Sequence, residues 1–225
     1  MRFGVVQFPG SCDDRDALLA CERVEGASAV LLWHGDRSLD GIDAVVIPGG
    51  FSYGDYLRVG AIARFSPMME SVIAFASGGG SVLGICNGFQ VLCEAGLLPG
   101  ALLPNVGLRF VCRQVGVEVV NADTPFTCAC DQGQVLSIPV KHTTGRYYAP
   151  DVELERMEAH GQIVLRYAHD GNPNGSSNDI AGVINDAQNV MGLMPHPEHA
   201  VDPIAGSVDG LALFTSMAMG VAARA

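Results

Sequence analysis

The chain is 225 residues long, with 48% hydrophobic residues and a formal charge of -11 at pH 7. This length and composition predict one folded domain over residues 1–225 and exclude a disordered chain. Among the thirteen basic residues only Lys141 is a lysine, so the sequence has no basic cluster that would neutralise phosphates. We therefore expect no nucleic-acid partner.

The first half of the chain alternates short strand-like runs with helical patterns, which is typical of a parallel sheet covered on both faces. The apolar run that opens the chain is too short for a signal peptide or a membrane span, so we expect a cytoplasmic protein without a membrane partner. The predicted strands are 3–8, 29–33, 44–47 and 81–85, and the predicted helices are 13–25, 61–76 and 89–95.

From about residue 108 the pattern changes to longer β-rich segments. These are 108–120, 134–140, 162–168, 180–185 and 190–194, with a final helix at 209–221. The turn-rich segment 170–179 is expected to connect two antiparallel strands. The sequence therefore predicts an α/β fold, a flavodoxin-like sandwich with a mainly parallel central sheet, helices on both faces, and additional antiparallel strands in the C-terminal half.

Cys86 directly follows the predicted strand 81–85 and stands between Gly84 and Gly88. This pattern is typical of a nucleophile elbow, in which a strained strand-to-helix turn leaves no room for side chains two residues away. Because a helix is predicted to follow, its dipole would favour a thiolate at Cys86. The sequence thus predicts a reactive cysteine.

His196 and Glu198 lie just beyond the strand 190–194, with prolines on both sides of the histidine. A cysteine nucleophile needs a base, and the base needs a group that fixes its tautomer. In an extended segment Glu198 would face the same side as His196, whereas His199 would face the opposite side. No comparable neighbour accompanies the other candidates, which are His142, His160 and His169.

The seven cysteines are expected to be reduced thiols, because their number is odd and no export signal precedes them. Cys112, Cys128 and Cys130 have neither a CxxC pair nor a histidine at ligand spacing. We therefore predict no metal site, and we expect the run Cys128-Ala129-Cys130 to lie on a strand, with successive side chains on alternate faces.

An oxyanion site is predicted at the turn that follows strand 44–47. In a parallel sheet the carboxyl ends of the strands share one edge, so this turn would lie beside the elbow. The backbone N–H groups near Gly50 and Phe51, together with that of Asn87, are the candidate donors.

Together these motifs resemble the class I glutamine amidotransferases, whose glutaminase domains carry a GxCxG elbow, an upstream PGG turn and a later HxE pair. Longer runs are similar to the glutaminase subunits of phosphoribosylformylglycinamidine synthases, and the resemblance covers nearly the whole chain. These runs are 7–11, 48–58, 86–90, 145–148 and 194–198. The run 48–58, PGGFSYGDYLR, is much more specific than the elbow.

The resemblance implies a glutaminase that hydrolyses L-glutamine through a thioester on Cys86, with His196 as base, Glu198 as its orienting acid and Gln90 as a substrate contact. It also implies an ATP-dependent synthetase subunit that uses the ammonia in purine biosynthesis, and it allows for a small third subunit. No GxxxxGK[ST] loop is present, so no cofactor is expected on this chain, and ATP and magnesium are expected on the partner. The interface candidates are Arg58, Arg64 and Arg146.

Two segments depart from the family pattern. Where the family usually reads GSNCDRD, residues 10–16 read GSCDDRD, and where it usually reads PVAHGEGRY, residues 139–147 read PVKHTTGRY. Neither departure replaces Cys86, His196 or Glu198. Partner contacts or gating near the second segment are expected to differ.

Two alternatives stay open at this point. An intracellular cysteine peptidase on a similar sheet can also use an elbow cysteine and a histidine, although the run 48–58 and the His196–Glu198 pair argue against it. A non-catalytic interaction subunit would bury Cys86 as an inert thiol.

Overall fold

The computed structural model describes residues 1–168 and 171–224. The described strands are β1 (Arg2–Gln7), β2 (Ser28–Trp33), β3 (Ala44–Ile47), β4 (Ser81–Ile85), β5 (Ala101–Pro104), β6 (Val111–Val119), β7 (Val135–His142), β8 (Thr144–Tyr148), β9 (Ile163–Tyr167), β10 (Ile180–Ile184) and β11 (Val190–Leu193). The helices are α1 (Asp14–Glu22), α2 (Pro67–Ser77), α3 (Asn87–Glu94), α4 (Asp151–Ala159) and α5 (Leu211–Ala222). Short 3-10 turns are η1 (Ser52–Asp55), η2 (Ala63–Phe65), η3 (Ser177–Asp179), η4 (Pro197–His199) and η5 (Pro203–Ala205).

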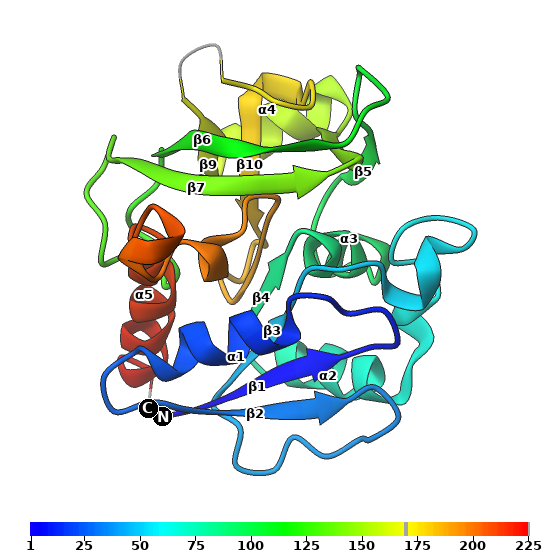
Figure 1. Ribbon diagram of the computed structural model, residues 1–225, viewed down its shortest axis with the longest axis vertical. Coiled ribbons are helices and arrows are strands. Elements are labelled where there is room, and N and C mark those ends of the chain that lie inside the picture. Colours follow the sequence, from blue (N-terminus) through cyan, green and yellow to red (C-terminus); the bar gives the residue numbers. More distant parts are fainter. Residues whose placement is uncertain (169–170, 225) are drawn as a thin grey trace.

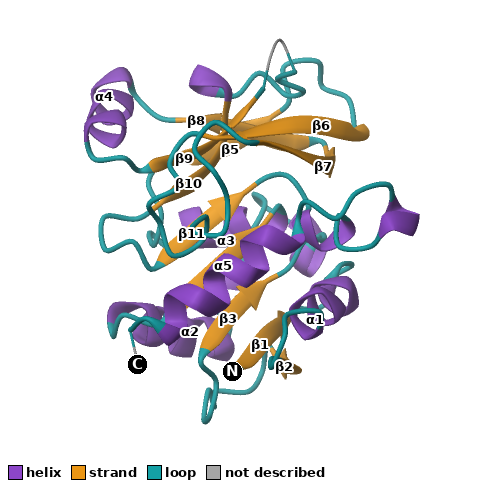
Figure 2. Cartoon of the chain, turned by 90° about the vertical axis from the view of Figure 1, so that its left-hand side faces the viewer, coloured by secondary structure: helices purple, strands orange, loops and turns teal. Residues whose placement is uncertain are grey.

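The main sheet has the strand order β2-β1-β3-β4-β11-β10-β9-β6-β7. Neighbouring strands from β2 to β11 are parallel, and those from β11 to β7 are antiparallel. Helices α1 and α5 cover one face of the parallel part, and α2 and α3 cover the other (Figures 1 and 2). The predicted α/β architecture is thereby confirmed, whereas the single domain over 1–225 stays a prediction.

Burial explains why the two halves of the sheet differ in sequence. Strands β3 and β4 are buried at every residue because helices cover both of their faces, and they read as continuous apolar runs. Strand β7 instead alternates, with Leu136, Ile138 and Val140 buried and Val135 and Ser137 exposed. Such alternation is typical of an antiparallel sheet with one face packed on the core.

The predicted helix 61–76 is wrong in its first turns. The chain forms η2, and α2 begins only at Pro67. Ser66 is extended, with φ -69° and ψ 151°, and its side chain accepts a hydrogen bond from the Met69 N–H. A residue before proline is driven out of the helical region, and a serine N-cap with proline at N1 starts a new helix.

Other elements were not predicted. These are helix α4 and the small antiparallel sheet β5–β8. In α4 only Leu154 and Met157 are buried, so the helical period is weak in the sequence. The expectation that Cys128-Ala129-Cys130 lies on a strand is also wrong, because residues 124–130 form turns in which the Thr124 and Thr127 carbonyls accept backbone hydrogen bonds.

Three parallel strands end side by side and position the candidate site. In the register of the sheet Ile47 pairs with Gly84, and Leu193 pairs with Ile85. The segments that leave these strands carry the Gly49–Gly50 turn, Cys86 and His196. No helix in the described ranges is long and apolar enough to cross a membrane.

We predict that Gly88→Ala destabilises the protein, because a Cβ at Gly88 would overlap the carbonyl oxygen of Ile47. The expected loss is about 1–3 kcal/mol in the free energy of unfolding, measured by urea denaturation. Gly107→Ala is the control, since nothing lies within 4 Å of a Cβ at that position. Equal stabilities of the two variants would contradict the elbow packing described here.

Candidate active site

Cys86 occupies a strained turn between β4 and α3. It is the N-cap of α3, with φ 51° and ψ -102°, and it is 6% exposed. Its N–H donates to the Leu193 carbonyl at 2.8 Å, which ties the turn to β11. A Cβ at Gly84 would come within 2.8 Å of the Gly88 carbonyl oxygen, so the crowding expected of a nucleophile elbow is present.

His196 and Glu198 form a buried pair. Imidazole Nδ1 lies 2.6 Å from Glu198 Oε1, and both side chains are almost entirely shielded from solvent. The pair is made in the 3-10 turn η4, not in the extended segment that was predicted. His196 Nε2 has no hydrogen-bond partner among the described residues, and His196 lines the same pocket as Cys86.

The surroundings of His196 stabilise its protonated form. Burial alone would lower the pKa of the imidazole, but the charges of Glu198 and Cys86, with their hydrogen bonds, raise it to about 10. A protonated imidazole beside a thiolate can hold the nucleophile ionised and then give its proton to a leaving group.

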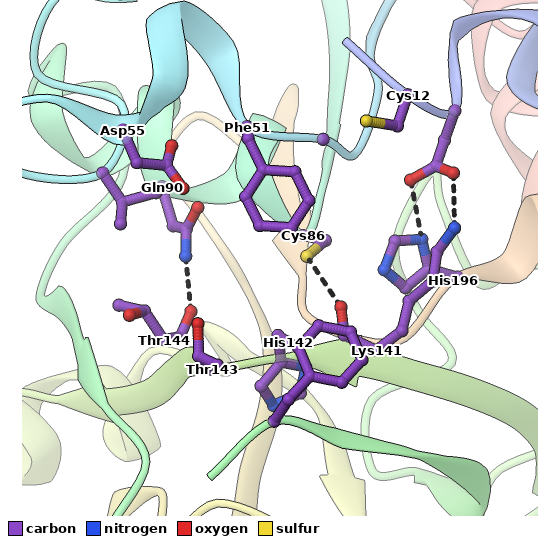
Figure 3. Close-up of a pocket in the computed structure, with 14 residues that line it drawn as sticks. Cys12, Phe51, Asp55, Cys86, Gln90, Lys141, His142, Thr143, Thr144 and His196 are labelled. Carbon is purple, nitrogen blue, oxygen red and sulfur yellow. Dashed lines mark hydrogen bonds and ion pairs between the residues drawn. The ribbon is translucent and has the colours of Figure 1, made fainter. Parts of the chain in front are cut away.

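Cys86 opens onto a pocket between the parallel strands and β7 (Figure 3). The predicted substrate contacts Gly50, Phe51 and Gln90 line this pocket. The Gln90 side-chain NH2 donates to the Thr144 carbonyl, and the amide of Asn87 donates to Gln90 Oε1 at 3.0 Å. Gln90 is thus held in place from two sides.

The candidate oxyanion donors differ in their present contacts. The Phe51 N–H donates to the Gly10 carbonyl at 2.9 Å and is therefore engaged. In the described residues no backbone carbonyl accepts from the N–H of Gly50 or Asn87. These two N–H groups are the better placed candidates, and their role stays a prediction.

Asp13 belongs to the site although the sequence analysis did not select it. Its side chain is buried, with Oδ1 2.5 Å from Lys141 Nζ and 3.2 Å from His199 Nε2, while Oδ2 lies 3.6 Å from His196 Nδ1. Burial would raise the pKa of this carboxyl, but His199, His196 and Lys141 together hold it well below its usual range. No local motif marks Asp13, because its partners come from distant parts of the sequence.

The prediction that His199 faces away from His196 is wrong. The tight turn η4 brings the two ring centroids within 5.5 Å, and His199 bonds to Asp13. Donor atoms of Asp13, His196, Glu198 and His199 lie within 4.8 Å of one another, so this set could hold a metal ion. The Lys141 ammonium already supplies a positive charge there, and the expectation of no metal stays a prediction.

Two further histidines now have defined surroundings. His142 lines the pocket, its Nε2 lies 3.0 Å from Asn174 Nδ2, and burial, with the nearby charge of His196, lowers its pKa to about 4. His160 is exposed and its Nδ1 lies 2.7 Å from the Arg156 carbonyl. His169 lies outside the described residues.

Asp55 is a second acid that the sequence analysis missed. It lines the pocket beside Gln90, and burial raises its pKa to about 6 despite a hydrogen bond from Asn87. The sequence contained a signal for Asp55, because this residue lies inside the run 48–58, which is specific to the family. A partly desolvated carboxylate in a pocket is suited to a positively charged ligand group.

A family model described as a CobB/CobQ-like glutamine amidotransferase domain matches residues 1–212. A phosphoribosylformylglycinamidine synthase subunit PurQ from Rubrobacter xylanophilus is 61% identical, over 98% of this chain and 99% of the relative. The chain belongs to the PurQ family of glutamine amidotransferases. A PurQ subunit from Synechococcus elongatus is 54% identical, over 99% of this chain and all of the relative.

Solved structures agree with this family. The structure of PurLQS from Thermotoga maritima matches with a TM-score of 0.88 and 44% identity over 97% of both chains. A glutamine amidotransferase from the same organism matches with a TM-score of 0.59 at 15% identity, covering all of this chain and 97% of that one, and shows the shared fold alone. Membership of the PurQ family favours a glutaminase over the peptidase and the non-catalytic subunit.

We predict that Glu198→Gln lowers the pKa of His196 by about one unit or more, because it removes the carboxylate that stabilises the imidazolium. Nitrogen-15 NMR of the imidazole during a pH titration measures this shift. Glu153→Gln, which alters an ion pair with Arg156 on α4, is the control and leaves the His196 titration unchanged. An unchanged titration in Glu198→Gln would contradict the electrostatic role described here.

Proposed function

We propose that this chain is the glutaminase subunit of a phosphoribosylformylglycinamidine synthase. It hydrolyses L-glutamine to glutamate and ammonia, and it passes the ammonia to a synthetase subunit that converts formylglycinamide ribonucleotide to formylglycinamidine ribonucleotide. The observation that carries the proposal is that the strained Cys86 and the buried His196–Glu198 pair lie at the same pocket, in a chain of the PurQ family.

The first half of the reaction forms a thioester. The Cys86 thiolate bonds to the side-chain amide carbon of glutamine, and the C=O electron pair moves onto oxygen, where the N–H groups of Gly50 and Asn87 stabilise the negative charge. The His196 imidazolium gives its proton to the amide nitrogen as the C–N bond breaks. Ammonia leaves, and a γ-glutamyl thioester stays on Cys86.

The second half restores the enzyme. Neutral His196 takes a proton from water as the water oxygen bonds to the thioester carbon, and the C–S bond breaks to release glutamate and the Cys86 thiolate. Glu198 holds the ring by Nδ1 and stabilises the imidazolium that re-forms. His196 thus donates a proton in the first half and accepts one in the second.

Asp55 is proposed to bind the α-ammonium group of glutamine. It is the acid that faces the pocket beside Gln90, whereas Asp13 is already paired with Lys141. Gln90 and Phe51 complete the proposed substrate contacts. Burial disfavours the ionised form of Asp55, and a substrate ammonium beside it would stabilise that ionised form again.

ATP and magnesium are proposed to bind the partner synthetase and not this chain. The only lysine, Lys141, is held by Asp13 and is not part of a glycine-rich phosphate loop. Ammonia in neutral water is mostly ammonium, which is not a nucleophile, so a protected path to the synthetase has a chemical reason. We expect low glutaminase activity until the partner docks.

The partner is proposed to dock around the mouth of the pocket. Phe51 and Phe110 line the pocket and are exposed, and Leu57, in the same loop 51–65 as Phe51, is 94% exposed. Large exposed apolar side chains that gather near a functional opening are typical of an interaction surface. The PurLQS assembly from Thermotoga maritima supports a synthetase partner, and a third subunit is part of this proposal.

The three arginine candidates have different contacts. The Arg58 guanidinium binds both oxygens of the Glu94 carboxylate at 2.6 Å, and Arg64 donates to the Glu94 carbonyl at 2.7 Å. These contacts fasten the loop 51–65 to the end of α3. Arg146 is partly buried in β8, so Arg58 is the candidate best placed for a partner.

We predict that Cys86→Ala abolishes the release of ammonia from glutamine, because the thioester cannot form. In a complex with the synthetase subunits, this variant keeps ammonia-dependent product formation and loses glutamine-dependent formation. Cys112→Ala, which changes an exposed thiol on β6, is the control and keeps both activities. Normal ammonia release by Cys86→Ala would overturn the proposed function.

We predict that the KM for glutamine rises as the pH falls below about 6, because protonated Asp55 cannot pair with the substrate ammonium. Asp55→Asn raises KM by about tenfold or more at neutral pH and removes this pH dependence, while kcat changes little. Initial rates with glutamine measure both constants. Hydrolysis of glutaramate, which lacks the α-ammonium, is the matched control, and an equal effect of Asp55→Asn on it would contradict this contact.

A further inference from the structure

The two segments that depart from the family pattern meet at the candidate active site. Asp13 follows β1 and Lys141 lies near the end of β7, 128 residues apart, yet Oδ1 and Nζ are 2.5 Å apart. The Asp13 side chain is only 4% exposed and that of Lys141 31%. This is therefore a largely shielded ion pair, in which loss of one partner leaves a buried charge uncompensated.

Asp13 packs directly against the base. Its Oδ2 lies 3.6 Å from His196 Nδ1, the nitrogen that Glu198 binds at 2.6 Å, so two carboxylates face one ring atom. A Cβ at Gly49 would overlap the Asp13 carboxylate and would lie 2.7 Å from His196 Cε1. The glycine therefore lets the acid, the ring and the proposed oxyanion turn pack together.

Lys141 connects the same acid to the nucleophile. Its backbone carbonyl lies 4.0 Å from Cys86 Sγ, while its ammonium binds Asp13. The Asp13 backbone N–H in turn donates to the Gly49 carbonyl at 3.3 Å. The ion pair thus joins β7, the turn after β3 and the segment after β1 around Cys86 and His196.

We propose that the Asp13–Lys141 ion pair is a positioning element for the Cys86–His196 pair. Asp13 holds the imidazolium together with Glu198, and Lys141 supplies the positive charge that allows a second carboxylate to be buried there. Its catalytic consequence rests on the proposed glutaminase function. The charged and titratable groups that face His196 are Asp13, Cys86, Lys141, His142, Glu198 and His199.

The test is the pH profile of Cys86 alkylation by iodoacetamide, followed for this cysteine by mass spectrometry. Asp13→Asn removes a negative charge, which disfavours proton binding by the cluster, so the profile moves to lower pH by about one unit. Lys141→Met removes a positive charge and moves the profile to higher pH by about the same amount. The double variant D13N/K141M returns close to the unmodified protein.

Opposite shifts that cancel in the double variant are a result that a packing role alone cannot give. The double variant also controls for loss of folding, because it removes both charges of the pair and leaves neither one buried without a partner. The matched control removes the exposed pair Arg156–Asp186 by R156M/D186N, and its profile is unchanged. Unshifted profiles in both single variants, or shifts in the same direction, would overturn the proposal.

Steady-state kinetics in the complex test the catalytic consequence. Asp13→Asn is expected to lower kcat for glutamine hydrolysis by about tenfold while KM stays within about twofold, because Asp13 contacts the base. Lys141→Arg keeps the charge and restores the profile that Lys141→Met displaces. If the alkylation profiles of the variants shift but the unmodified protein does not hydrolyse glutamine, the proposed function is refuted and the ion-pair inference is kept. If the unmodified protein is an active glutaminase but the profiles do not shift, only the inference is refuted.

Discussion

The close approach of α3 to β3 is the constraint on which the rest of the site depends. Gly88 packs against the Ile47 carbonyl, where any side chain would overlap it, and this contact lets the helix begin immediately after the strand. Cys86 is thereby fixed at φ 51° with its thiol at the edge where β3, β4 and β11 end together. The Gly49–Gly50 turn follows β3 on one side of β4, and His196 follows β11 on the other side.

Around this turn the protein buries an unusual number of charges. A buried ion pair stabilises only when each charge has a partner with good geometry, and here they are shared among a few groups. Glu198 and Asp13 face His196, and Lys141 faces Asp13. Glu198 and Cys86 raise the pKa of His196, and His199, His196 and Lys141 lower the pKa of Asp13, so His196 and Asp13 are both held in their charged forms.

Backbone strain gathers on the other side of the pocket. Tyr53, Asp55 and Leu57 all have positive φ, within the run PGGFSYGDYLR, and Asp55 also has a raised pKa. Such conformations are costly and persist where the surrounding structure fixes them, which is common at binding sites. The hydrogen bonds of Arg58 and Arg64 to Glu94 help to fix this loop next to the Cys86 pocket.

The sequence by itself determined the α/β architecture, the elbow at Cys86 and the pairing of His196 with Glu198, because each depends on residues only a few positions apart. The start of α2 at Ser66–Pro67 could also have been predicted, because helix capping depends on neighbouring residues. The apolar period that extends back to residue 61 led instead to a predicted helix that began too early. Only the tertiary structure decided that Asp13 and Lys141 meet beside His196, because 128 residues separate them and their contact depends on how β7 crosses the ends of the parallel strands.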